Sequence, residues 1–186
     1  MKVYFMRLSL TGLIILALTT FASGNGWSNT YMRTKSELFT EQTNPELYCL
    51  AQNIYYESRA DNIAGKYAVA DVVLNRVHDD RFPNTICEVV KQGPISKWWK
   101  EEKDKEVPIR NRCQFSWYCD GKSDNPKNAD AWRDSQEIAY RIYNLGVYRG
   151  ISEGATHYHA TYVDPSWNKQ MQTIGRIGLH LFFRAP

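Results

Sequence analysis

The chain has 186 residues, the usual length of one domain, and the composition of an ordinary globular protein, with 43% hydrophobic and 23% charged residues. Its formal net charge is +3, and two of the basic residues, Lys2 and Arg7, lie in an N-terminal stretch without acids, so the rest of the chain is nearly neutral. A nearly neutral domain offers no electrostatic basis for binding nucleic acid, and we exclude that class of function.

The first 24 residues have the pattern of a targeting segment. A positively charged start precedes an apolar stretch, residues 8–22, that is broken only by Ser, Thr and Gly, and small residues follow at 22–24. The stretch is short for a bilayer span, which needs about 20 apolar residues. We predict a signal peptide at residues 1–24 that engages the membrane during export, with a retained or releasable anchor as the alternative. The expected location is the periplasm, the cell wall or the extracellular space.

Four cysteines, Cys49, Cys87, Cys113 and Cys119, all lie in the part expected to be exported. An even number in an oxidising compartment predicts two disulfides, for which three connectivities are possible. We favour Cys113–Cys119, which closes a short loop, and this choice leaves Cys49–Cys87. Free thiols or a metal site are the alternatives, although the spacing matches no zinc pattern.

Residues 25–42 are polar and without pattern, so we interpret them as a linker or N-terminal arm before a domain at residues 43–186. A first helix is predicted from Pro45 to about Ser58, because a capping residue precedes a proline at the first helical position. Asp61 can cap a second helix, in which apolar side chains from Ile63 to Val77 recur every three or four residues.

The second half of the domain changes from helical to extended patterns. Between the helices, residues 93–112 form a highly charged stretch bracketed by prolines, and we expect a surface excursion whose paired Trp98 and Trp99 act as a lid or a local plug. The pattern therefore predicts an α+β fold that is mainly helical, with a small β element near the C-terminus. The remaining expected elements are a turn at 79–84, a short helix at 85–92, a long helix at 129–145, and extended segments at 157–163 and 174–183.

Glu57 is the most informative residue of the first helix. It lies in the last turn, one turn after Asn53, where the partial negative charge of the helix end disfavours a carboxylate. Burial beside Tyr55 and Tyr56 would act in the same direction and raise the pKa of Glu57, as a general acid working near neutral pH requires. Periodicity alone also permits a surface glutamate paired with Arg59.

Several short motifs carry a resemblance that favours the first interpretation. Together they span residues 46–183, and in their order the sequence resembles the cell wall hydrolase family that includes the spore-cortex-lytic enzymes of sporulating bacteria. The motifs are Cys49–Arg59, Ala70–Val77, Phe82–Val90, Cys113–Trp117 with Cys119–Gly121, Ala155–Ala160, Pro165 with Trp167, and Ile177–Phe182.

The resemblance implies a fold related to lysozyme and the lytic transglycosylases, peptidoglycan as the substrate, and Glu57 as the catalytic residue. It also implies a lytic mechanism, in which the acid protonates the glycosidic oxygen between N-acetylmuramic acid and N-acetylglucosamine and the muramyl 6-hydroxyl then attacks C1 to leave a 1,6-anhydro end. This chemistry needs one carboxylate, whereas simple hydrolysis needs a second, about 5–5.5 Å or about 6.5–9.5 Å away. The candidates for a second carboxylate are Asp61, Asp71, Asp120 and Asp164, and none lies in a motif that demands the role.

We expect five further side chains to contact the substrate. Gln114 and Ser116 can hydrogen-bond acetamido or hydroxyl groups while Phe115 anchors their loop, and Tyr158 falls where lytic enzymes often place a ring beside the acid. Asn53, beside Glu57, and Trp167, in a matching motif, complete the set.

Two other functions stay open at this point. His157, His159 and His180 suggest a zinc-dependent peptidoglycan amidase or peptidase, and the aromatic residues suit a non-catalytic module that binds the wall. The favoured assignment expects no cofactor, no metal and a monomer. Residues 93–112 are longer than the family pattern and leave the substrate preference open.

Overall fold

The computed structural model describes residues 39–186. The signal peptide predicted at residues 1–24 and nearly all of the linker predicted at 25–42 lie outside the described residues. Within the described part, no helix combines the length and apolar character needed to cross a bilayer. The elements are α2 (Pro45–Ser58), α3 (Ile63–Val77), α4 (Ile86–Val90), α5 (Lys97–Lys103), α6 (Ala129–Leu145), β1 (His157–Ala160), β2 (Gln172–Ile177) and β3 (His180–Arg184), with short 3₁₀ helices at Ser116–Cys119 and Ser166–Gln170.

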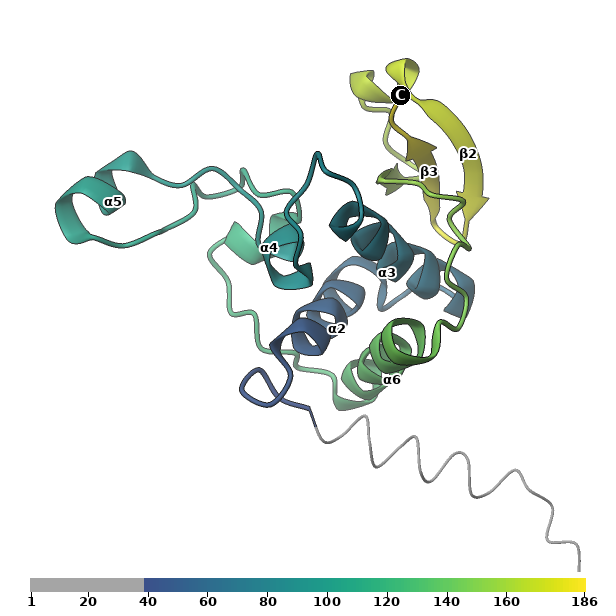
Figure 1. The fold of residues 1–186 in the computed structure, drawn as a ribbon, viewed down its shortest axis with the longest axis horizontal. Helices are drawn as coiled ribbons and strands as arrows, with labels where there is room; N and C mark the ends of the chain where they lie inside the picture. The colour runs from purple at the N-terminus through teal and green to yellow at the C-terminus, as the bar shows by residue number, and fades with distance from the viewer. Residues whose placement is uncertain (1–38) are drawn as a thin grey trace, which may run out of the picture.

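The three long helices α2, α3 and α6 form the body of the domain, with α4 packed against α2 and α3 (Figure 1). Their facing side chains are almost completely buried and include Leu50 and Ile54 of α2, Val73 of α3 and Ile142 of α6. Burying a side chain of this size contributes roughly 1.5–3 kcal/mol, so this interface is the main source of the domain's stability. α2 lies at its centre, in contact with α3, α4 and α6.

Helix starts follow the capping signals of the sequence, with one correction. The Asn44 side chain accepts the Leu47 N–H before Pro45, as the sequence predicts. The cap of α3 is Asn62, which accepts the Gly65 N–H, and not Asp61 as the sequence suggested. The apolar pattern of α3 is also shorter than expected, since Ile63 is 66% exposed at the first helical position.

Antiparallel strands in the order β1-β3-β2 form a small sheet beside the helical body (Figure 1). Phe182 of β3 is fully buried against Ala68 and Val72 of α3, which attaches the sheet to the helices. The extended segment expected at 174–183 is in fact two strands, because Gly178 with its positive φ of 59° makes the turn between β2 and β3. The prediction of a mainly helical α+β fold with a small β element near the C-terminus is confirmed.

Residues 93–112, called the arm below, leave the body on the side away from the sheet (Figure 1). Backbone pairing closes the base of the arm, where the Ser96 N–H donates to the Val107 carbonyl at 2.9 Å. Helix α5 at its far end buries no residue, and the adjacent rings of Trp98 and Trp99 are 56% and 38% exposed. The expected surface excursion is confirmed, and its tryptophans do not plug the core.

Both predicted disulfides are present. Cys49–Cys87 joins α2 to α4 across 38 residues of sequence, and Cys113–Cys119 closes a short loop before the long connection to α6. The described residues contain no free cysteine, so the alternatives of free thiols and of a cysteine metal site do not apply to them.

Candidate active site

Glu57 lies at the point where the end of α2 meets the sheet. Its Oε2 accepts a hydrogen bond from the Tyr158 hydroxyl of β1 at 3.2 Å. Burial raises the pKa of Glu57, while the Tyr158 hydrogen bond and the nearby charge of Arg76 lower it by less. Arg59, the alternative partner, places its guanidinium over the Tyr55 ring, 5.2 Å from the centroid. The geometry therefore describes a shielded carboxyl group that holds its proton to a higher pH than usual, as a general acid does.

Arg76 is a buried cation that interacts electrostatically with Glu57. Its Nε donates to the Thr156 carbonyl at 2.7 Å, and its guanidinium lies between the rings of Phe82 and Phe115, at 5.0 and 5.3 Å. Its interaction with Glu57 lowers the pKa of that carboxyl group. Sequence reasoning missed Arg76, although it lies in the motif Ala70–Val77, because a single arginine in an apolar helix gives no sign of what it faces.

The resemblance predicted an aromatic ring beside Glu57, and Tyr158 lies there. The ring packs edge-on against His180 at 5.2 Å and against Phe182 at 5.6 Å between ring centroids. Burial and the adjacent Glu57 carboxylate raise the pKa of the Tyr158 phenol well above its usual value of 10. The phenol consequently stays protonated and donates its single proton to Glu57.

The other expected substrate contacts divide into exposed and inaccessible side chains. Gln114 and Ser116 are exposed in the loop closed by Cys113–Cys119, and Phe115 is buried and anchors that loop, as expected. Asn53 has no exposed surface, and its Oδ1 accepts the Trp117 indole N–H at 3.2 Å. The expected contact between Asn53 and a substrate is therefore wrong for this structure, because tertiary packing covers the Asn53 side chain completely.

The pairing of β1 with β3 separates the three histidines that suggested a zinc site. His157 lies opposite Phe183 in the sheet, so His157 and His159 share one face, whereas His180 lies opposite Ala160 and shares the other face with Tyr158. His180 pairs with Asp61 at 3.1 Å. Among the described residues no group of three or more His, Cys, Asp or Glu side chains could hold a metal ion.

Trp167 lies on the sheet face away from Tyr158. Its ring packs against His157, His159 and Phe183, with centroids 5.6–5.7 Å apart. The structure thus brings Tyr158 to Glu57 but does not bring Trp167 there.

The four candidates for a second carboxylate are engaged elsewhere. Asp71 is fully buried, pairs with Arg149, and accepts the backbone N–H groups of Gly150 and Ser152. Asp61 accepts the Leu179 N–H at 3.0 Å and pairs with His180. Both carboxylates support the fold. The last two, Asp120 and Asp164, accept hydrogen bonds from Lys122 and Asn168.

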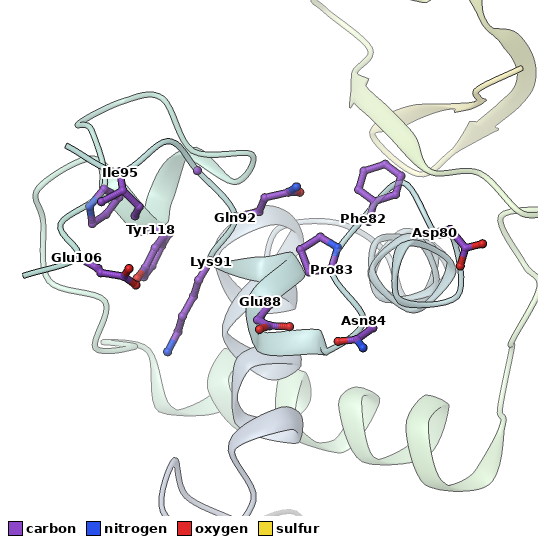
Figure 2. A pocket seen from close by; sticks show the side chains of 12 residues that line it. Asp80, Phe82, Pro83, Asn84, Glu88, Lys91, Gln92, Ile95, Glu106 and Tyr118 are labelled. Carbon is purple, nitrogen blue, oxygen red and sulfur yellow. The ribbon is translucent and has the colours of Figure 1, made fainter. Parts of the chain in front are cut away.

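Two grooves lie close to the residues that surround Glu57, but Glu57 itself lines neither of them. The larger, of about 710 Å³, lies between the base of the arm and α4 (Figure 2), with Tyr118, Lys91 and Phe82 among its walls. The smaller, of about 530 Å³, is lined in part by Tyr56 and Trp117, whose rings stack at 4.7 Å. Phe82 also contacts Arg76, and Trp117 also contacts Asn53. Each groove therefore has one wall residue that touches a neighbour of Glu57.

Comparisons with known proteins find similarity in sequence and in fold. The spore cortex-lytic enzyme of Bacillus subtilis (strain 168) is 38% identical over 48 residues, which are 26% of this chain and only 16% of that protein. The catalytic domain of the germination-specific lytic transglycosylase SleB from Bacillus anthracis has the same fold, with a TM-score of 0.54 and 22% identity over 76% of this chain and 96% of that chain. The catalytic domain of the Bacillus cereus SleB protein aligns with a TM-score of 0.44 and 21% identity, over 76% of this chain and 91% of that one.

A family model described as Cell Wall Hydrolase matches residues 60–183, well over half of the chain. The match begins three residues after Glu57, so the family model gives no evidence about Glu57. The chain belongs to the cell wall hydrolase family.

Proposed function

We propose that this protein cleaves the glycan strands of peptidoglycan between N-acetylmuramic acid and N-acetylglucosamine, as a lytic transglycosylase with Glu57 as its acid. The observation that carries the proposal is the half-buried Glu57 carboxyl group with its raised pKa and its hydrogen bond from Tyr158. Membership of the cell wall hydrolase family supports it, as do a relative named a spore cortex-lytic enzyme and a fold shared with a lytic transglycosylase domain.

The proposed reaction uses one carboxyl group twice. Glu57 donates its proton to the glycosidic oxygen as the bond from that oxygen to C1 of the muramic acid breaks. The muramyl 6-hydroxyl oxygen then bonds to C1, and its proton passes to the Glu57 carboxylate, which returns to its starting state without consuming water. The Tyr158 hydroxyl and the Arg76 cation stabilise the carboxylate between the two steps. The engagement of Asp61 and Asp71 in the fold favours this route over hydrolysis with a second carboxylate.

Gln114 and Ser116 are the proposed contacts for the sugar's acetamido and hydroxyl groups. They flank Phe115, whose ring lies 5.3 Å from the Arg76 guanidinium. Because Arg76 interacts with Glu57, their loop lies close to the residues around Glu57. We further propose that the protein acts outside the cytoplasm as a monomer after removal of a signal peptide. The two disulfides agree with an exported location.

Digestion of isolated peptidoglycan followed by mass spectrometry of the products tests the proposed function. We expect muropeptides that end in 1,6-anhydro-muramic acid, released equally well in the presence of a chelator. Reducing ends would replace transglycosylation with hydrolysis, freed stem peptides would indicate an amidase or peptidase, and tight binding without soluble products would indicate a wall-binding module.

Replacing Tyr158 with Phe is expected to move the alkaline limb of the kcat–pH profile to higher pH. The Tyr158 hydrogen bond lowers the pKa of Glu57, so its loss raises that pKa further. Because the acid acts only when protonated, its activity is lost as pH rises through this pKa, and the variant retains activity to higher pH. Tyr162→Phe, at an 87% exposed tyrosine, is the control and leaves the profile unchanged. A limb that moves to lower pH would contradict the assignment.

A further inference from the structure

Helix α5, at the far end of the arm, contains only two apolar residues, Trp98 and Trp99, and both lie on the surface. Their side chains are 56% and 38% exposed, and the rings pack edge-to-face with centroids 4.9 Å apart. Each ring restricts the other, so the pair presents an aromatic surface that is formed before anything binds. Exposed pairs of this kind are typical of binding surfaces, because covering two indole rings removes a large apolar area from water.

The larger groove begins beside the candidate active site. Phe82 forms part of its wall, and the Phe82 ring lies 5.0 Å from the Arg76 guanidinium. Arg76 in turn donates through Nε to the Thr156 carbonyl at 2.7 Å. Thr156 directly precedes β1, in which the Tyr158 hydroxyl donates to Glu57 at 3.2 Å. A continuous series of contacts therefore joins this end of the groove to the acid.

The opposite end of the groove belongs to the arm (Figure 2). Its walls there include Ile95 and Glu106, which precede and follow α5 in the sequence. The Lys100 ammonium of α5 donates to Glu106 at 3.0 Å, and the Ile109 N–H donates to the Pro94 carbonyl at 2.8 Å across the base of the arm. A polymer that lies along the groove consequently passes from the surroundings of the acid to the base of the tryptophan helix.

The tip of the arm has no net charge, which narrows the class of partner. A balanced segment is not attracted to anionic lipids or to nucleic acid, since both bind an excess of Lys and Arg. A glycan strand suits such a surface, because its pyranose rings are uncharged and have faces of C–H groups that can pack on an indole. Residues 97–106 balance four basic side chains against four acidic ones: Lys97, Lys100, Lys103 and Lys105, and Glu101, Glu102, Asp104 and Glu106.

We propose that Trp98 and Trp99 form a second glycan-binding surface, which holds sugars of the strand at a distance from the bond that Glu57 cleaves. The inference rests on the proposed function, because the strand that the arm holds is the proposed substrate. Both contacts engage one polymer, so binding at the arm raises the local concentration of the strand at the cleavage site. A short fragment does not reach both surfaces. The arm thus makes long glycan strands better substrates than short ones.

The test compares the full-length wild type with Trp98→Ala combined with Trp99→Ala, on long glycan strands freed of stem peptides and on short fragments of them. We expect KM for the long strands to rise about tenfold, with kcat and the cleavage of short fragments unchanged, because the rings do not touch the reacting bond. Trp98→Phe with Trp99→Phe keeps both rings and should retain most of the affinity. Tyr162→Ala, at an 87% exposed tyrosine after β1, is the matched control and should leave both substrates unaffected.

Three results would overturn the proposal. The first is an unchanged KM for long strands, including the case in which the variant loses binding only to vesicles of phosphatidylcholine and phosphatidylglycerol, which would assign the arm to a membrane. The second is an equal loss on long and short substrates, which would indicate damage to the active site. The third is a loss confined to peptidoglycan that carries stem peptides, which would assign the arm to the peptide.

A binding measurement separates this inference from the proposed function. If the wild type cleaves neither substrate, the proposed function fails. Calorimetric titration of the long strands into Glu57→Gln, with and without the two alanine substitutions, then tests the arm alone. Weaker binding by the variant that lacks both tryptophans supports the second surface, and equal binding overturns it.

Discussion

Glu57→Gln is expected to lower the rate of anhydro-muropeptide release by roughly 10²–10⁴-fold, because the amide cannot donate a proton to the glycosidic oxygen. The variant keeps the shape of the side chain and an oxygen that accepts from Tyr158, so the loss reports chemistry and not misfolding. Glu137→Gln on the surface of α6 is the matched control and should leave the rate unchanged. Full activity of Glu57→Gln would refute the mechanism.

The same variant is expected to be more stable than the wild type at pH 7. Burial raises the pKa of Glu57 in the folded state above its ordinary value of 4.5. The protonated form therefore stabilises the fold, and this contribution is fully present below pH 4.5 and is lost as pH rises through the folded-state pKa. Urea unfolding should show a higher free energy of unfolding for Glu57→Gln at pH 7 and no difference near pH 4. A variant that is less stable at pH 7 would mean that Glu57 is a structural ion-pair partner.

The disulfide Cys49–Cys87 is expected to contribute the larger share of the covalent stabilisation. It closes a loop of 38 residues and joins α2 to α4, whereas Cys113–Cys119 spans only 6 residues. From the loss of chain entropy in the unfolded state, replacing the first pair by alanines costs about 4 kcal/mol and replacing the second about 2 kcal/mol.

Urea unfolding of the two double variants under oxidising conditions measures the difference. Each variant serves as the control for the other, because both remove one disulfide from the same protein. If the short loop proved the more stabilising, the order of the two effects would have to come from strain or packing and not from chain entropy.

Features that depend on neighbours in sequence were predictable. The cap at Asn44, the proline at the start of α2 and the stop of α6 at Gly146, with its φ of 65°, follow from backbone chemistry within one turn. The placement of Glu57 in the last turn of a buried helix follows from periodicity in the same way. The main error of this kind was the single extended segment expected at 174–183, in which the turn at Gly178 was not recognised.

The surroundings of Glu57 depend on contacts between distant parts of the chain. Tyr158 is 101 residues away from Glu57, and Arg76 reaches Thr156 across 80 residues. No periodic pattern reveals such pairs, and only the resemblance pointed to Tyr158. Asp61 shows the opposite error, since a residue that was expected to cap a helix instead binds the turn between two strands.

By itself, the sequence predicted the long helices, favoured the two cysteine pairs that form and singled out the Glu57 carboxyl group, because these features depend on spacing, caps or motif order. It did not predict α5, which lies in a charged stretch without a readable pattern. Only the tertiary structure decided what surrounds that carboxyl group: which donor faces it, that Asn53 is inaccessible, and that Trp167 and the histidines lie elsewhere. The physical reason is that burial and electrostatics act through space. A pKa and a hydrogen-bond direction are set by the atoms that packing brings within a few ångströms, whatever their distance along the chain.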